Sequence, residues 1–170
     1  MLEKKAAGIR LLILDVDGVL TDGRITLNER GEETKSFNVK DGLGLQMAAS
    51  EGIEVVILTG RTSKAVAHRA RELGIAEVYQ GVADKRKTLQ QLISQKGLDK
   101  TQVCCIGDDL PDLTMFGECG ICVAVSDAVS EIRQEADFIT RAKGGWGAVR
   151  EVCDWLLRCK GRSPKMSFTE

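Results

Sequence analysis

The sequence has no excess of positive charge and no long apolar run, and each absence excludes a class of partner. Its 170 residues carry a net charge of −1 without a long basic block, so the electrostatic footprint of a nucleic-acid-binding protein is missing. No apolar run approaches the roughly 20 residues that span a bilayer. Lys4 and Lys5 precede an apolar stretch, but this stretch, 11–14, is too short for a signal peptide and ends at Asp15. We therefore expect neither a nucleic-acid partner nor a membrane partner.

Histidine is also scarce, because His68 is the only one in the chain. A zinc site at the pair Cys119 and Cys122 would need further ligands at suitable spacing, and the sequence offers none. A thioredoxin-like site would place this pair at the start of a helix, whereas Cys122 leads into an apolar run. We interpret all the cysteines as buried, reduced thiols that act as small hydrophobic side chains, which predicts a cytoplasmic location. They are Cys104, Cys105, Cys119, Cys122, Cys153 and Cys159.

Apolar runs of strand length alternate with helical patterns along the chain. Runs that are apolar on both faces are typical of parallel strands covered by helices on each side. Such runs lie at 11–14, 53–58, 103–106 and 121–125, with a weaker one at 138–139. Helical stripes lie at 66–73, where Gly74 follows as a C-cap, at 89–93 and at 149–157. This order predicts an α/β fold with a three-layer, doubly wound, mainly parallel sheet, as one domain over 1–160 with a tail at 161–170.

The segment 23–39 departs from this alternation. Ile25 and Leu27 precede a turn at Gly31, and Phe37 and Val39 follow it, which predicts a β-hairpin inserted after the first strand. An isolated two-stranded hairpin is marginal in water, so its apolar stripe needs a cover. It either lies on its own domain or pairs with hairpins of other subunits, and we favour the second alternative.

Several predicted strands end in carboxylates. Asp15 and Asp17 follow the first strand, and Asp108 follows the strand at 103–106. In a doubly wound sheet these strand ends meet at the edge where ligands bind. The carboxylates would repel one another there unless a divalent cation lay between them, and Mg²⁺ prefers such oxygen ligands. The alternative is that the acids are solvated loop residues or caps, and Asp109 is a candidate N-cap because Pro111 follows closely.

Hydroxyl, lysine and glycine residues reach the same edge. Thr59 follows the strand at 53–58 and can donate a hydrogen bond, and Lys85 can supply a point charge to a phosphate. Backbone N–H groups near Gly18 and Gly60 can face a phosphate oxygen. Such a set suits phosphoryl transfer, in which a carboxylate nucleophile forms an aspartyl-phosphate.

Four motifs in order, DVDGVLTDG (15–23), LTGR (58–61), Lys85 and GDDLPD (107–112), resemble those of the haloacid dehalogenase-like phosphatases. Spacing and chain length are most similar to the small bacterial enzymes that act on 3-deoxy-D-manno-octulosonate (KDO) 8-phosphate, a step of lipopolysaccharide precursor synthesis. The resemblance implies that Asp15 is the nucleophile and Asp17 the general acid and base. It also implies that Asp15, Asp17 (through its carbonyl) and Asp108 bind Mg²⁺, that Thr59 and Lys85 bind the phosphoryl group, and that Asp109 and Asp112 act behind these ligands or through water.

The resemblance also implies that the hairpin stands where larger relatives carry a cap domain, and that a homotetramer assembled through the hairpin closes each site. Arg61 is the candidate for the sugar carboxylate, since arginine pairs with carboxylates through two parallel hydrogen bonds. The full set of predicted substrate-binding residues is Gly18, Gly60, Arg61, Lys40, Asp41 and Arg69. We assign no role to Trp146 or His68.

Three alternatives stay open. A phospho-receiver domain also surrounds Mg²⁺ with acids, a threonine and a lysine, but its acid pair is usually adjacent, whereas Asp15 and Asp17 are separated by Val16. A non-catalytic assembly module would not need the full set of catalytic groups. A phosphatase for a nine-carbon keto-acid 9-phosphate (sialic acid or KDN type) differs only in substrate, and Arg61 favours the eight-carbon sugar.

Overall fold

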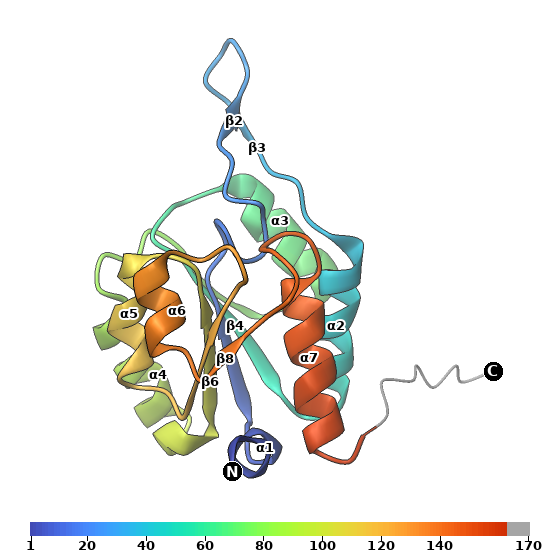
Figure 1. The fold of residues 1–170 in the computed structure, drawn as a ribbon. Helices are drawn as coiled ribbons and strands as arrows, with labels where there is room; N and C mark the ends of the chain where they lie inside the picture. Colours follow the sequence, from blue (N-terminus) through green and yellow to red (C-terminus); the bar gives the residue numbers. More distant parts are fainter. Residues whose placement is uncertain (163–170) are drawn as a thin grey trace, which may run out of the picture.

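Residues 1–162 are described by the computed structural model, which has three layers of helix, sheet and helix (Figure 1). A six-stranded sheet of order β5-β4-β1-β6-β7-β8 forms the middle layer, and all its strand pairs are parallel. The predicted fold class is therefore confirmed. The strands are β1 Leu11–Leu14, β4 Glu54–Leu58, β5 Glu77–Tyr79, β6 Val103–Gly107, β7 Ile121–Ala124 and β8 Phe138–Ile139.

The register of the sheet decides where the site forms. All four residues of β1 are buried, because helices cover both of its faces. Leu14, the last residue of β1, pairs with Ile57 of β4 and with Ile106 of β6. The three central strands consequently end within a residue or two of the same level, so the residues that follow them share one edge of the sheet.

Helices flank the sheet in two groups. Figure 1 shows α2, α3 and α7 on one side and α4, α5 and α6 on the other, with α1 beside the N-terminal ends of the strands. Among the helices of residues 1–162, none combines the length and the apolar character needed to cross a bilayer. The helices are α1 Leu2–Ala7, α2 Val39–Ser50, α3 Lys64–Leu73, α4 Lys85–Gln95, a 3₁₀ turn at Lys100–Gln102, α5 Leu110–Phe116, α6 Ser130–Glu135 and α7 Ala148–Cys159.

Helix ends follow the predicted capping residues. Gly74 ends α3 in the left-handed conformation with φ 74°, as expected of a C-cap glycine. Asp109 is the N-cap of α5, its side chain accepts a hydrogen bond from the Leu110 N–H, and a proline occupies the first turn. These local signals fix where the acidic loop after β6 turns into helix.

The hairpin projects from the body of the molecule, but it is shorter than predicted (Figure 1). Its paired strands are β2 Thr26–Leu27 and β3 Glu33–Thr34, with Gly31 in the turn at φ 72°. Phe37 packs against the core instead of facing Leu27, and Val39 is already the first residue of α2. Asn38 ends the extended segment, because its side chain caps α2 by accepting a hydrogen bond from the Lys40 N–H.

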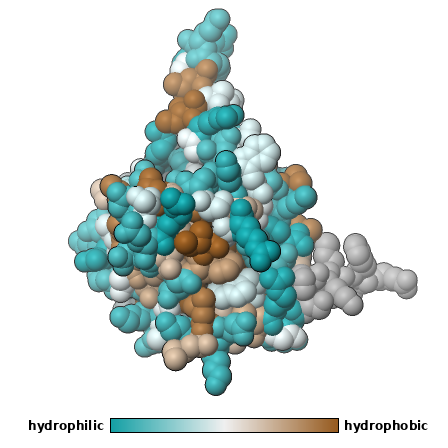
Figure 2. Space-filling model, in the orientation of Figure 1, coloured by the Kyte–Doolittle hydropathy of each residue, from teal (hydrophilic) through white to brown (hydrophobic). Residues whose placement is uncertain are grey.

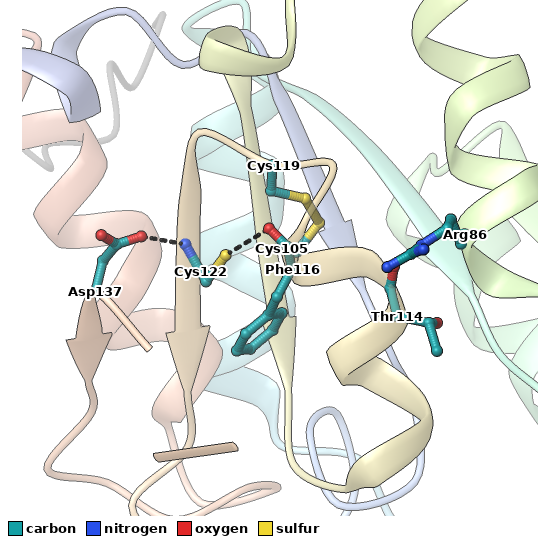
Figure 3. The surroundings of a disulfide bond; sticks show 7 residues. All are labelled: Arg86, Cys105, Thr114, Phe116, Cys119, Cys122 and Asp137. Atoms are coloured by element: carbon teal, nitrogen blue, oxygen red, sulfur yellow. Dashed lines mark hydrogen bonds between the residues drawn. A yellow bond between two sulfur atoms is a disulfide. The ribbon is translucent and has the colours of Figure 1, made fainter. Parts of the chain in front are cut away.

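The prediction that all six cysteines are buried thiols is wrong. Cys105 of β6 and Cys119, in the connection from α5 to β7, form a disulfide (Figure 3). Their Cα atoms are 6.4 Å apart, a separation that a disulfide spans, because β7 returns the chain alongside β6. Cys104, Cys122 and Cys153 are buried free thiols, and Cys159 is partly buried. Burial, followed by the charge of Asp137, raises the pKa of Cys122 to about 12, so this thiol is neutral and donates to the Phe116 carbonyl at 3.2 Å.

The predicted C-terminal tail, 161–170, is described only at Gly161 and Arg162. Gly161 has φ 71°, and the Arg162 guanidinium lies 3.1 Å from the carboxylate of Glu51. The rest of the predicted tail lies outside the described residues.

Candidate active site

A pocket of about 310 Å³ opens at the carboxyl ends of the central strands. It contains all four of the sequence motifs that the strand ends were expected to bring together. Its lining residues are Asp15, Asp17, Gly23, Thr59, Gly60, Arg61, Lys85, Asp108, Asp109, Pro111 and Asp112. Residues from four separate segments therefore meet in one place, as the parallel topology predicts.

Three carboxylates in this pocket are close enough to share a cation. Oxygen atoms of Asp15, Asp108 and Asp112 lie within 4.8 Å of one another. Burial is the largest effect on Asp15, and the charge of the neighbouring Asp112 is the next. Together they raise the pKa of Asp15 to about 6, although Lys85 acts in the opposite direction. Burial, then Asp112 and Asp15, raises the pKa of Asp108 to about 8. These side chains are therefore reluctant to ionise together without a cation, and carboxylate oxygens are ligands that Mg²⁺ prefers.

The charge cluster predicts how stability responds to pH and Mg²⁺. Raised carboxyl pKa values mean that the folded, metal-free protein holds these protons more tightly than the unfolded chain. The contribution of Asp15 and Asp108 to the free energy of unfolding is therefore fully present at pH values below their ordinary pKa of about 3.8. It is lost as the pH rises through their pKa values in the folded protein, about 6 and about 8. Mg²⁺ should offset that loss, so the gain in melting temperature on replacing EDTA with Mg²⁺ should be larger at pH 8 than at pH 5.5.

The measurement is thermal unfolding across this pH range, in EDTA and in Mg²⁺. Asp108→Asn should reduce the Mg²⁺-dependent gain, whereas Glu29→Gln in the exposed hairpin turn should leave it unchanged. An equal gain at both pH values would contradict the electrostatic account.

Lys85 compensates part of the negative charge. It is the first residue of α4, and its side chain is only 7% exposed. Its Nζ lies 3.0 Å from Asp15 Oδ1 and 2.7 Å from Asp112 Oδ1. Burial lowers the pKa of Lys85, but Asp112 and Asp15 together outweigh that effect and raise it above the ordinary value. The lysine therefore stays charged beside the predicted nucleophile.

Asp112 is a buried carboxylate that connects two of the segments around the site. It is 1% exposed, and its Oδ2 accepts a hydrogen bond of 3.0 Å from the Asp108 N–H. Its other oxygen accepts from Lys85 at 2.7 Å. Asp112 thus joins the loop after β6 to the start of α4, and sequence reasoning had placed it only behind the metal ligands.

The Asp17 side chain lines the same pocket but is not part of the cluster of three carboxylates. Lys35 contacts its Oδ1, and Arg61 Nε lies 3.6 Å from its Oδ2. Both cations also pair with Glu33: Lys35 Nζ lies 3.2 Å from Oε1, and Arg61 Nη2 lies 2.6 Å from Oε2. The two oxygens of the Asp17 carboxylate are therefore paired with cations, and its carbonyl stays the predicted metal ligand.

Sequence reasoning missed Glu33 and Lys35, although both form ion pairs with residues that line the pocket. Their charges alternate along the predicted second hairpin strand, and that alternation indicates an exposed face as readily as a site. Only the fold shows that this strand starts beside the catalytic loop.

Close backbone approaches shape the catalytic loop. Gly18 has φ 86°, and a Cβ there would overlap the carboxylate of Asp108. On the other side, a Cβ on Gly144 would overlap the carbonyl oxygen of Gly18, and Gly145 N–H donates to the Val19 carbonyl at 2.9 Å. The loop before α7 therefore rests directly on the loop that carries Asp17, a contact that the glycine pair alone did not reveal.

Four of the predicted substrate-binding residues are not among those that line this pocket, and one of them, Gly18, lies against the Asp108 carboxylate instead. Asp41 is 1% exposed, and its carboxylate accepts hydrogen bonds from Gly147 N–H at 3.3 Å and Arg150 N–H at 2.8 Å. It therefore caps the N-terminus of α7 instead of facing a ligand. Arg69 pairs with Glu72 on α3 and lines a separate small cavity. Lys40 is exposed on the first turn of α2.

All predicted site residues other than these four line the pocket. Thr59 is 2% exposed and follows β4, and Gly60 and Arg61 complete the same turn. His68 is exposed on α3 and is not among the residues that line the pocket. Trp146 is 67% exposed and lines a neighbouring hollow of about 210 Å³ beside Phe37.

Comparison with known proteins gives consistent results. A family model described as haloacid dehalogenase-like hydrolase matches residues 71–151. The chain is 48% identical to the 3-deoxy-D-manno-octulosonate 8-phosphate phosphatase KdsC of Escherichia coli K12 over 158 residues, which are 93% of this chain and 84% of the relative. The chain belongs to the haloacid dehalogenase-like hydrolases.

Solved structures of relatives in this hydrolase family superimpose closely. A Yersinia pestis 3-deoxy-D-manno-octulosonate 8-phosphate phosphatase matches with a TM-score of 0.92 and 45% identity, covering 94% of this chain and 86% of that one. The Moraxella catarrhalis phosphatase, solved in complex with a magnesium ion, a phosphate ion and KDO, matches with a TM-score of 0.91 and 45% identity over 94% and 91% of the two chains. The fold of this chain therefore agrees with its membership of the hydrolase family.

Proposed function

We propose that this chain is a Mg²⁺-dependent phosphatase that hydrolyses 3-deoxy-D-manno-octulosonate 8-phosphate to KDO and phosphate, for lipopolysaccharide precursor synthesis. The observation that carries this proposal is the convergence of Asp15, Lys85 and Asp108 in one pocket at the strand ends. The KdsC relatives carry that activity in their names, and the Moraxella relative was solved with Mg²⁺, phosphate and KDO. The chain covers most of the length of each.

In this proposal an oxygen of Asp15 attacks the phosphorus of the substrate, and the bond from phosphorus to the sugar oxygen breaks. Asp17 donates a proton to the leaving oxygen, which yields KDO and an aspartyl-phosphate at Asp15. Asp17 then takes a proton from a water molecule that attacks the same phosphorus, and phosphate leaves as the Asp15 carboxylate is regenerated.

Other residues in the pocket hold the transferred group. The Lys85 ammonium lies 3.0 Å from Asp15 Oδ1 and is placed to offset the charge of phosphoryl oxygens beside it. The Thr59 hydroxyl and the turn at Gly60 can donate hydrogen bonds to those oxygens. Asp15, Asp108 and the Asp17 carbonyl would hold Mg²⁺, which would neutralise phosphate charge when bound.

The direct experiment compares turnover of the eight-carbon 8-phosphate and a nine-carbon keto-acid 9-phosphate, with Mg²⁺ and with EDTA. We expect Mg²⁺-dependent phosphate release with a clear preference for the eight-carbon substrate. Equal rates on both acids would defeat the substrate assignment but not the phosphatase. No release from either substrate, or release of equal rate in EDTA, would defeat the function itself.

We further propose a homotetramer assembled through the hairpin. Ile25 is 56% exposed and Leu27 is 58% exposed on a hairpin that extends away from its own body, and Figure 2 shows apolar surface on it. Exposed apolar side chains on a short, isolated hairpin favour burial against another subunit. The other alternative, a flap on its own domain, would have covered these side chains.

The double variant Ile25→Asp, Leu27→Asp is expected to dissociate the assembly, because charges buried between subunits lack partners. Light scattering coupled to size exclusion should give the mass of one chain instead of four. Arg30→Asp in the exposed hairpin turn changes charge without removing apolar area, so it should keep the wild-type mass. A monomeric wild-type protein would contradict the proposal.

A cytoplasmic location is the remaining proposal. Four free cysteines support a reducing compartment, whereas the Cys105–Cys119 disulfide does not. Cell fractionation, with thiol alkylation of the extracted protein, would test both the compartment and the state of this pair.

A further inference from the structure

We propose that Lys35, on the hairpin, is a positioning residue that fixes the carboxylate of Asp17 for its part as base in the hydrolysis of the aspartyl-phosphate. The inference rests on the proposed function, because it assigns Asp17 to the proton transfers. It makes the hairpin part of the acid–base apparatus of its own subunit, in addition to any contact with other subunits.

The position of Lys35 is specific. It directly follows β3, and its side chain is only 1% exposed although the hairpin beyond it is open to solvent. It reaches back 18 residues along the chain to contact Asp17 Oδ1. A lysine is rarely buried without partners, so its ammonium is held there by the carboxylates that surround it.

The partners of Lys35 are themselves anchored. Glu33 accepts from Arg61 at 2.6 Å, and Lys35 Nζ lies 3.2 Å from the other Glu33 oxygen. Arg61 Nε in turn lies 3.6 Å from Asp17 Oδ2. The four side chains form a closed ring of alternating charge, in which each oxygen of Asp17 faces a different cation. Such a ring fixes the orientation of a carboxylate better than a single exposed ion pair, which contributes little.

The orientation of Asp17 has a kinetic consequence. A base must lie within hydrogen-bond reach of the proton it removes, and small displacements of a catalytic group are costly. In the absence of Lys35 the Asp17 side chain keeps only the longer contact to Arg61. The step that depends on Asp17 as a base, hydrolysis of the aspartyl-phosphate, should then become slow.

The test uses 4-nitrophenyl phosphate, whose leaving group needs no proton, so that Asp17 matters mainly in the second step. For Lys35→Met, which keeps side-chain length, we expect kcat to fall roughly 10- to 100-fold. KM should fall by a similar factor, so kcat/KM changes little. Rapid mixing should show a burst of nitrophenol close to the enzyme concentration. Lys35→Arg should restore part of kcat, and the remote, exposed Lys100→Met should match wild type in all three measurements.

The outcomes separate the possibilities. A wild-type kcat for Lys35→Met, or an equal fall of kcat and kcat/KM without a burst, would overturn the assignment. If Lys35→Met does not fold, Glu33→Gln takes its place, because this variant loosens the anchor of Lys35. It must show the same kinetic pattern in weaker form, and a Glu33→Gln variant without that pattern would also overturn the assignment. The wild type could fail to hydrolyse sugar phosphates while Lys35→Met still shows the burst with 4-nitrophenyl phosphate. That combination would defeat the proposed substrate and leave the role of Lys35 standing.

Discussion

Asp15→Asn is expected to abolish phosphate release while leaving the fold intact. The amide has the shape of the carboxylate but cannot attack phosphorus, and loss of a nucleophile typically costs about 10⁴-fold or more in kcat. Stability in EDTA should be unchanged or higher, because the variant removes a buried charge whose pKa is raised to about 6. Lys85 keeps its second partner, Asp112, at 2.7 Å. Phosphate release and thermal unfolding measure the two effects.

The same variant distinguishes the alternatives. Asp22→Asn, in an exposed part of the same loop, is the matched control and should retain wild-type turnover. Residual Mg²⁺-dependent turnover by Asp15→Asn would contradict the assignment of the nucleophile. In the wild type, a phospho-enzyme that persists for minutes would favour a receiver domain, whereas rapid loss of the phosphoryl group supports a phosphatase. An assembly module would show no turnover even in the wild type.

Gly144→Ala is expected to have the second largest effect. A Cβ at this position would overlap the carbonyl oxygen of Gly18 and lie 2.5 Å from its carbonyl carbon and 3.2 Å from the Val19 nitrogen. These are backbone atoms of the catalytic loop and cannot rotate away, so one of the two loops must move. We expect a loss of about 2 kcal/mol or more in the free energy of unfolding. Displacement of Asp17 by about 1 Å should cost about 100-fold in kcat.

Urea unfolding and steady-state kinetics, with assays run well below the melting temperature, separate the two losses. Gly117→Ala is the control, because its nearest neighbour is the Arg86 side chain at 3.7 Å and its backbone is helical. It should unfold at the same urea concentration as wild type or a higher one. Wild-type kcat in Gly144→Ala would show that the loop before α7 does not position the catalytic loop.

The parallel sheet could be predicted because its strands are buried on both faces. Runs such as Ile53–Leu58 contain almost no polar residue, so periodicity and length are enough to find them. β5, Glu77–Tyr79, was missed because it is short, carries a charge and is only partly buried at the edge of the sheet. α1 was missed because its six residues expose most of their side chains and bury only Ala6, which leaves no amphipathic stripe.

Of the predicted site residues that follow strand ends, all but Gly18 line the pocket, since topology brings those ends together. The positions of residues that do not follow strand ends depend on other features of the fold. Asp41 was expected at the substrate, but it lies near the N-terminus of α7, whose unpaired N–H groups attract a carboxylate. Lys35 and Glu33 contact the pocket residues Asp17 and Arg61 only because of the path of the hairpin. The disulfide depends on how β7 returns beside β6, and cysteine spacing carries no record of that pairing.

The Cys105–Cys119 bond also bears on the unfolded chain. Its sequence separation is 14 residues, and the ring that it closes contains Asp108, Asp109 and Asp112. Closing a loop of about 15 residues removes chain entropy from the unfolded state worth roughly 3 kcal/mol. An oxidised chain therefore begins refolding with the two ends of this acidic loop already joined, so less chain entropy is lost when β6 and β7 come together. Thiol reduction would release that tether, so the same sequence has two different starting points for assembling its acidic edge.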